Sequence, residues 1–495
     1  RGAASAVYGS DALAGVINIV TRRPATGYRE SLSVELGEDD YQQFSVSALG
    51  REGVFDYTVE IATRDDGEPV PGSARDSDSA NLRLGWQPDE RHDLTFNFRY
   101  LEGDRSSYPE QSGGPEFAAI DALDEAHYED QVLGITWDLQ VSPGWRSRLS
   151  LTRFDHEEDY TSPGIVPFDA VPPNAAATDF TRDQLQWVNS IEPAPGYRLD
   201  VGADYRDEQG DSSGYLEFSG NRLATDFELD RDVAGAFAAL SARPLDGLLL
   251  NGGVRYDDPD GFDGEVSWSV GAKVEAGAGF TLSANLAEAF KLPSFFALGN
   301  ALVGNPALQP EYSVSWDAGV AWRGGSGMLL AATWFANEFE DLVDFDSTLF
   351  KNVNRGRVET SGVELEALLP LAADLALRAN GTWTDIDVGG QDTVLTGRPE
   401  WSAGMVADWR LSPAWQLALD YRFSGRQWAA SRYTGAEQTL KLDAYHRVDS
   451  VLHWTPTARW RLQLSVDNLL DENYETAVGF PAPGRGVRVG ITFSP

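Results

Sequence analysis

The sequence predicts an all-β protein, a 22-stranded antiparallel transmembrane β-barrel. Three observations predict this fold class. Apolar and polar residues alternate with period two in many segments, and short turns alternate with long loops along the chain. No stretch approaches the roughly 18 consecutive apolar residues of a membrane helix. Since only alternate residues of a barrel strand face lipid, the mean hydropathy of −0.33 is compatible with strands that cross a membrane.

The period-two pattern is clear in residues 94–100, where Leu94, Phe96, Phe98 and Tyr100 share one face and polar residues share the other. The same alternation appears in 197–206, 415–424 and 460–467. About 22 segments between residues 30 and 493 read as strands.

The connections between these strands fall into two classes. Short turns are expected at 51–53, 89–91, 141–144, 191–196, 243–245, 276–279, 323–326, 370–371, 411–412 and 456–458. Long loops are expected at 66–78, 104–128, 160–178, 210–225, 291–310, 343–359, 386–398, 427–442 and 471–482, with shorter ones at 37–40 and 257–263. Short turns at one end and long loops at the other are typical of an outer-membrane barrel.

Aromatic residues flank many of the short turns and predict a membrane-interface girdle. They are Trp86, Trp145, Tyr197, Trp322, Trp415, Trp454 and Trp460. A soluble β-propeller is the rival fold, because hairpins recur about every 42 residues. The chain lacks the Gly-His and Trp-Asp signatures of a propeller, and its strands are longer than those of most soluble sheets.

Composition excludes several functions. The net charge of −38 argues against nucleic-acid binding, and the absence of cysteine excludes disulfides and thiolate metal sites. No phosphate-binding loop and no nucleophile elbow occurs, so an enzyme is not expected. The five histidines are scattered. Haem uptake would need an axial ligand in an outer loop, and His127 is the residue that keeps this alternative open.

The first 24 residues, RGAASAVYGSDALAGVINIVTRRP, are the most specific motif. A loop of small residues precedes the apolar run 16–20, which is typical of a buried strand, and Gly9 and Gly15 suit close backbone approach. As a string, the segment resembles the end of the plug domain of TonB-dependent outer-membrane receptors. The residues that carry this resemblance are Arg1, Gly2, Tyr8, Gly9, Gly15 and Asn18.

The resemblance continues along the chain. The loop FKLPSFFALGNALVGNPALQPE (290–311), the Asn354-Arg355-Gly356 step, the string DNLLDENYET (467–476) and Pro483-Gly484-Arg485 are all similar to this family. It implies that 1–24 is the C-terminal remnant of a plug and 25–495 the barrel. It also implies that most of the plug, the TonB box and the signal peptide lie upstream of Arg1. Within the family, the start and the final loop are most similar to cobalamin receptors.

The resemblance implies active import of a scarce nutrient, cobalamin or a ferric siderophore, across the bacterial outer membrane. Its implied partners are the TonB–ExbB–ExbD complex, the small-molecule ligand and outer-membrane lipid, with the barrel as a monomer. A passive porin is the alternative, and the plug motif speaks against it. Lumen-facing charges such as Arg198 and Asp200 are expected to hold the plug.

Two sets of outer-loop residues are candidate sites. Asp66, Asp76, Asp78 and Asp121 are candidate calcium ligands, because clustered carboxylates supply the oxygens that calcium needs and cobalamin receptors are similar in having such carboxylates in these loops. The alternative is a solvated acidic loop. The sequence predicts no required cofactor and leaves calcium as a possible one. Tyr108, Phe295, Phe296 and Trp428 are candidate contacts to a bulky ligand, or else they stabilise the loops.

Overall fold

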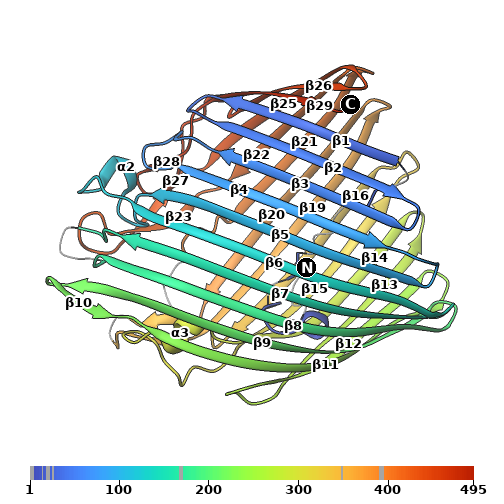
Figure 1. Cartoon of the computed structure of the whole chain (residues 1–495), viewed down its shortest axis with the longest axis horizontal. Helices are drawn as coiled ribbons and strands as arrows, with labels where there is room; N and C mark the ends of the chain where they lie inside the picture. Colours follow the sequence, from blue (N-terminus) through green and yellow to red (C-terminus); the bar gives the residue numbers. More distant parts are fainter. Residues whose placement is uncertain are drawn as a thin grey trace.

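The computed structural model describes residues 5–13, 15–17, 23–24, 27–166, 171–346, 349–389 and 395–495. Its body is one closed antiparallel β-barrel (Figure 1). The main sheet has 23 strands. One of them, β10 (Asn221–Ala224), pairs only with the end of β9, and the other 22 strands form the wall. The predicted fold class and strand number are confirmed, and a propeller is excluded.

The wall strands follow chain order around the barrel. They are β1 (Gly27–Gly37), β2 (Gln42–Glu52), β3 (Phe55–Asp65), β4 (Arg75–Trp86), β5 (His92–Ser107), β6 (Asp124–Ser142), β7 (Trp145–Ser162), β8 (Asn174–Ala194), β9 (Tyr197–Phe218), β11 (Phe227–Leu245), β12 (Leu248–Pro259), β13 (Glu265–Gly277), β14 (Phe280–Lys291), β15 (Glu311–Arg323), β16 (Leu329–Glu340), β19 (Arg357–Ala372), β20 (Leu375–Val388), β21 (Trp401–Ser412), β22 (Trp415–Ser424), β25 (Tyr445–Thr457), β26 (Trp460–Asp467) and β29 (Gly486–Phe493). The barrel closes where β1 pairs with β29.

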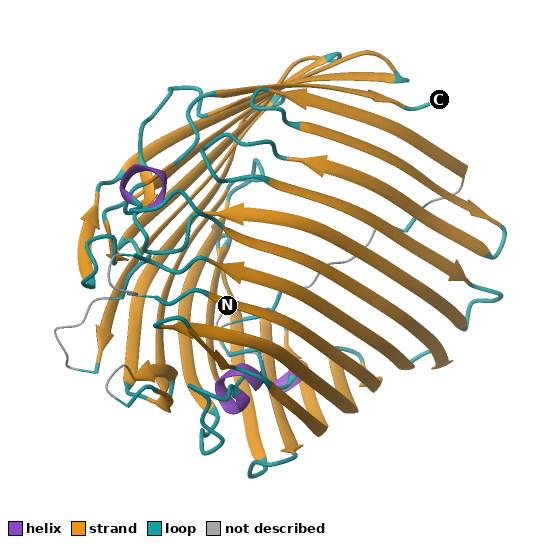
Figure 2. Cartoon of the chain, turned by 60° about the vertical axis from the view of Figure 1, so that its left-hand side comes forward, coloured by secondary structure: helices purple, strands orange, loops and turns teal. Residues whose placement is uncertain are grey.

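The remaining elements are short. Two helices and three hairpins lie in the long loops, which gather at one end of the barrel (Figures 1 and 2). They are α2 (Gly114–Phe117), α3 (Phe295–Gly299), β17 (Val343–Asp346) with β18 (Lys351–Asn354), β23 (Gln427–Ser431) with β24 (Gln438–Leu442), and β27 (Glu475–Ala477) with β28 (Phe480–Pro481). Among the described residues, no helix is long and apolar enough to cross a membrane.

The two faces of the wall differ as the sequence predicts. In β9, Tyr197 and Tyr205 are exposed on the outer face, whereas Asp204, Arg206 and Glu208 are buried on the inner face. This alternation follows from the pleat of the strand, which points successive side chains to opposite sides. The lumen is therefore lined by polar and charged groups.

The predicted aromatic girdle lies on the outer face at the short-turn end. Six of its seven members are exposed there, and Trp322 is half-buried against Phe280. The rings of Trp415 and Trp454 stack with centroids 5.4 Å apart. This placement is the one that a membrane-interface girdle requires.

Every predicted short turn overlaps an observed turn or lies within three residues of one, and three of them, 243–245, 370–371 and 411–412, are displaced entirely into strands. Residues 243–245, for example, belong to β11, and the turn that follows is formed by Asp246 and Gly247. The displacement arises because polar residues continue into the ends of the strands, so that polarity alone does not mark where backbone pairing stops.

Three predicted long loops are shorter than expected, because strands extend into them, and 210–225 is mostly strand. Residues 104–128, 160–178 and 210–225 contain the outer ends of β5 to β9, and β9 runs on to Phe218. Backbone pairing continues through these extensions without interruption. Both faces are polar there, and the alternation that signals a strand is consequently lost from the sequence.

The outer face of these extensions carries a row of carboxylates. Neighbouring positions on seven consecutive wall strands, β4 to β9 and β11, are occupied by Asp78, Glu102, Glu129, Glu157, Asp179, Asp211 and Glu228. They have the same strand parity as the outward-facing apolar residues nearer the turns. We call this set the carboxylate row.

Candidate functional site

The N-terminal segment lies against the inner wall of the barrel. The short helix α1 (Ser5–Tyr8) contacts β11, β12, β13 and β14, and Leu13 packs on the buried residues Ala287 and Ala289 of β14. The hydroxyl of Ser313 donates to the backbone carbonyl of Leu13 over 2.8 Å. Residues 5–13 are thus held against β11 to β15.

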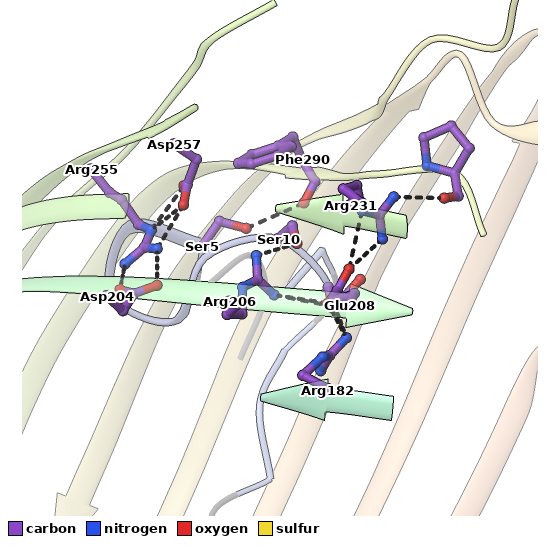
Figure 3. Close-up of polar contacts among 12 residues, drawn as sticks. Ser5, Ser10, Arg182, Asp204, Arg206, Glu208, Arg231, Arg255, Asp257 and Phe290 are labelled. Atoms are coloured by element: carbon purple, nitrogen blue, oxygen red, sulfur yellow. Dashed lines mark hydrogen bonds and ion pairs between the residues drawn. The ribbon is translucent and has the colours of Figure 1, made fainter. Parts of the chain in front are cut away.

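A buried arginine lies beside this segment (Figure 3). The Arg255 guanidinium is 1 % exposed and donates to Asp204 over 2.7 and 2.9 Å. On its other side it donates to Asp257 over 2.6 to 2.9 Å. Because a buried charge needs counter-charge and hydrogen bonds, these two carboxylates account for its position.

Two glycines make room for this guanidinium. A Cβ atom on Gly235 would lie 2.0 Å from Arg255 Nη2, and one on Gly9 would lie 3.2 Å from the same atom. Gly9 also has a φ of +80°, which side-chain-bearing residues rarely adopt. The predicted close approach at Gly9 is therefore to the barrel wall.

A second cluster surrounds Glu208, whose side chain is 1 % exposed (Figure 3). Arg231 and Arg182 approach its carboxylate to 2.6 and 2.7 Å, from the two strands next to β9. Arg206 donates to the hydroxyl of Ser10 over 3.0 Å, and Arg182 also approaches Asp11, at 3.3 Å. The N-terminal segment thus adds a hydroxyl and a carboxylate to a cluster rich in arginine.

A separate contact fixes the segment at the short-turn end. Arg23 pairs with Asp56 over 2.9 Å and also with Asp93. Asp56 is buried and is shared with Arg83 of β4. The segment is therefore held at both ends by ion pairs with the barrel.

The apolar run 16–20, predicted as a buried strand, is described only at its start. Val16 and Ile17 are exposed and belong to no strand, and residues 18–20 lie outside the described residues. Arg1, Gly2 and Asn18 lie outside the described residues, as does the side chain of Tyr8.

A cavity of about 600 Å³ lies at the long-loop end, and we call it the loop cavity. Its walls are the loops 38–41, 66–73 and 474–486, together with the inward-facing Arg447, Asp467 and Arg488. Asp467 bridges the two arginines, at 2.8 Å from Arg488 and 3.6 Å from Arg447. Its size is within the range of small-molecule sites.

Asn468 shapes one wall of this cavity. Its buried side chain donates to the carbonyls of Glu472 and Pro483 and accepts from the backbone N–H of Glu472. Asp471 accepts the backbone N–H of Arg485 over 2.9 Å. These bonds explain the string 467–476 in structural terms, since they fold the last loop back over the rim of the barrel.

The four predicted calcium ligands are divided between two places. Asp66 lines the loop cavity and pairs with Arg64, whereas Asp76 and Asp78 point outward from β4. Asp121 accepts a hydrogen bond of 2.6 Å from Tyr108, which raises the pKa of that tyrosine. Across the described ranges, no group of three or more His, Asp or Glu side chains is arranged to hold a metal ion. The calcium site stays a prediction, and its ligand set is not assembled in this structure.

The predicted ligand-contacting aromatics are also dispersed. Tyr108 lines the loop cavity. Phe295 is buried against Phe180 and under the guanidinium of Arg231, whereas its neighbour Phe296 is exposed. Trp428 is partly exposed, with the Lys441 ammonium over its ring. Phe295 therefore packs against the wall, and a ligand role for these four aromatics stays a prediction.

Two further expectations change. His127 lies on an outward-facing position of β6, where it contacts Asp104 over 3.0 Å, and is not in a loop over the lumen. Arg198 and Asp200 pair with each other and with Ser190 near the turns, rather than with the described N-terminal residues. Arg206, which does bind the segment, was predicted from the sequence only as part of the polar face of β9, together with Asp204.

Residues 63–469 match the family model described as TonB dependent receptor-like, beta-barrel. The chain belongs to this family of TonB-dependent receptors. It is 28 % identical over 514 aligned residues to the vitamin B12 transporter BtuB of Vibrio cholerae, covering all of this chain and 78 % of the transporter. The receptor is accordingly a bacterial outer-membrane β-barrel, with its long loops on the extracellular side.

Solved structures share the fold. The ferric yersiniabactin uptake receptor FyuA of Yersinia pestis superposes with a TM-score of 0.85 at 16 % identity, over all of this chain and 84 % of that one. The ferripyoverdine receptor of Pseudomonas aeruginosa gives 0.85 at 15 % identity, over all of this chain and 75 % of that one. These relatives are receptors and transporters, not enzymes. The predicted family, location and import function are confirmed.

Proposed function

We propose that this receptor imports cobalamin, with a ferric siderophore as the alternative cargo, using energy from TonB–ExbB–ExbD. The observation that carries the choice of cargo is the sequence likeness to a vitamin B12 transporter along the whole chain. The structural likeness to siderophore receptors supports the shared fold but not the cargo, because those identities are 20 % or lower.

The lumen supports active transport over passive diffusion. A porin keeps an open channel, whereas here α1 and Leu13 lie against the inner wall. Arg206 and Arg182 of the Glu208 cluster bind Ser10 and Asp11, and Ser313 binds the carbonyl of Leu13. Apart from the packing of Leu13 on β14, these contacts are single hydrogen bonds and ion pairs. A partner that pulls on the segment breaks them while the wall strands stay paired.

Cyanocobalamin binding to the receptor, expressed from its whole gene and purified in detergent, tests the cargo. Tight binding that weakens when calcium is chelated supports cobalamin and the predicted calcium site together. Tight binding that is indifferent to chelation supports cobalamin and removes calcium. No binding in either condition contradicts the cobalamin proposal, and uptake of ferric siderophores that requires TonB then becomes the expected result.

A further inference from the structure

The short strand β10 and the outer end of β11 form an open sheet edge at the long-loop end of the barrel (Figure 1). On one side, both strands pair with β9. On the other side, β12 pairs with β11 only from Val233 inward, and one backbone hydrogen bond of 2.8 Å, from Asp260 to the carbonyl of Asp232, extends this contact. Within the described ranges, no strand pairs with residues 221–231 on the side away from β9.

This edge is continuous, although β10 and β11 are separate strands. Ala224 pairs with Tyr215 of β9 and Phe227 pairs with Ser212, so the register against β9 is unchanged across residues 225–226. At roughly 3.3 Å per residue, the edge is about 40 Å long. An open edge of this kind presents unpaired N–H and C=O groups to which an extended chain can pair.

The even-numbered residues of β11 direct their backbone groups toward the open side. The carbonyl of Asp232 accepts a hydrogen bond on that side, whereas the N–H of Thr225 donates to Gly214 of β9. Because backbone direction alternates along a strand, Glu228 and Asp230 point their N–H and C=O groups to the open side as well. Their side chains lie on the outer face of the wall, where Glu228 belongs to the carboxylate row, and both residues are exposed.

The two faces of the edge differ in chemistry. On the outer face, the carboxylates of Glu228 and Asp230 have no ion pair with any described residue. On the inner face of the same tip, Leu223 and Phe218 are 43 % and 53 % exposed. A strand added at this edge would therefore place its side chains alternately beside carboxylates and beside apolar groups. Cross-strand pairs of opposite charge and pairs of apolar side chains both stabilise a sheet.

We propose that this edge binds an extended polypeptide segment in which basic and apolar residues alternate, and that the segment is added as an antiparallel strand to β10 and β11. Backbone hydrogen bonds at Glu228 and Asp230 supply affinity, and the side chains on the two faces supply selectivity. A second copy of this chain is disfavoured, because its edge and its net charge of −38 are both acidic. The partner is a protein that presents a basic, extended segment on the extracellular side of the outer membrane. This binding goes beyond import and does not depend on the cargo.

The probe is a fluorescent synthetic peptide of about eight residues that alternates lysine and valine, long enough to cover the outer end of β11. Its binding to the receptor in detergent is followed by fluorescence anisotropy. We expect saturable binding, with hydrogen exchange slowed in residues 221–232. A peptide that alternates glutamate and valine should bind at least about tenfold more weakly, because like charges would be opposed. Equal binding of the two peptides, or binding of neither, would overturn the proposal.

Two N-methylated forms of the lysine peptide separate backbone pairing from charge attraction. In an antiparallel pair, residues directly opposite Glu228 and Asp230 direct their own backbone groups toward the receptor and their side chains to the same outer face. These residues are the lysines in the expected register. Methylation of the lysine N–H groups should therefore weaken binding at least about tenfold, whereas methylation of the valine N–H groups, which face solvent, should not. Equal affinities of the two methylated peptides would show that charge alone binds the peptide and would overturn strand addition.

Receptor variants test the same edge from the other side. Glu228→Pro removes an N–H group from the open edge without removing a hydrogen bond to β9, and proline is tolerated at such positions of an edge strand. We expect weaker binding of the lysine peptide, with unchanged compact migration of the barrel in detergent gels. Glu228→Gln/Asp230→Asn should reduce the preference for the lysine peptide over the glutamate peptide.

Glu102→Gln/Glu129→Gln is the matched control, because it removes two charges from the same outer surface, on β5 and β6, away from the edge. This control should bind the lysine peptide as the unchanged receptor does. An equal loss in the control and in Glu228→Gln/Asp230→Asn would indicate attraction by the whole acidic surface and overturn a site at the edge. A dimer in detergent that protects residues 221–232 from exchange without peptide would identify a second copy as the occupant and overturn the proposed partner.

Discussion

The side chain of Arg255 shows how the receptor keeps charges buried in its lumen. Five hydrogen bonds join its guanidinium to Asp204 and Asp257. The alternation of polar and apolar residues in β9 predicts that Asp204 faces inward, but its ion pair with Arg255 could not be predicted from the sequence. The two residues are 51 positions apart, with β11 between their strands, and only the register of three strands brings them together.

Replacement of Arg255 by leucine leaves two carboxylates buried without a counter-charge, so we expect a loss of stability of about 3–5 kcal/mol. The temperature at which the folded barrel loses its compact migration in detergent gels is the measurement. Arg198→Leu is the control, since that side chain is half-exposed and its pair with Asp200 contributes about 1 kcal/mol or less. Adding Asp204→Asn and Asp257→Asn to Arg255→Leu should restore much of the loss. An equal effect of the two arginine changes would contradict this account.

At the scale of elements, the outer ends of β4 to β9 and β11 contain a destabilising arrangement of charges that the sequence alone does not reveal. The carboxylate row places like charges on neighbouring strands, and directly opposed like charges destabilise a sheet. The sequence predicted loops here, because acidic residues are depleted from ordinary strands. The strands form nevertheless, since each extension continues a hydrogen-bond ladder that begins in the apolar part of the wall.

Neutralising part of the row should therefore stabilise the extensions. For Asp179→Asn/Asp211→Asn we expect slower hydrogen exchange in the outer ends of β8 and β9, equivalent to about 0.2–1 kcal/mol. High salt should shrink the difference, because exposed charges are screened. Asp183→Asn is the matched control, since Asp183 lies on β8 as well but is paired with Arg153 over 3.0 Å. Faster exchange in the double variant would contradict the idea that repulsion between these carboxylates destabilises the strand ends.

At the scale of the whole molecule, strand number and the side of each loop were predictable, whereas the path of the N-terminal segment was not. Alternating loop lengths report the direction of every strand, and 22 is the resulting count. The segment's contacts depend on distant strands such as β11 and β14, which local patterns do not encode. The closure of the barrel also depends on distant residues, since β1 meets β29 over six paired positions, 32–37 with 488–493.

This short seam should be the weakest part of the wall, because β8 and β9 pair at 19 positions whereas β1 and β29 pair at six. Ser33 and Thr492 face each other across it, with hydroxyl oxygens 3.1 Å apart, and the chain has no cysteine to interfere. A disulfide from Ser33→Cys/Thr492→Cys should raise the temperature of barrel unfolding by several degrees in the oxidised form alone. Ser31→Cys/Ser47→Cys is the control, since those hydroxyls are 2.7 Å apart but join β1 to its neighbour β2. The seam disulfide spans 459 residues and the control 16, so the loop-closure argument and the weak-seam argument both predict a larger gain for the seam.

Hydrogen exchange separates these two explanations. If the seam opens first, exchange in β1 and β29 is the fastest of the wall strands and slows selectively on oxidation. Uniform exchange around the barrel would contradict a weak seam.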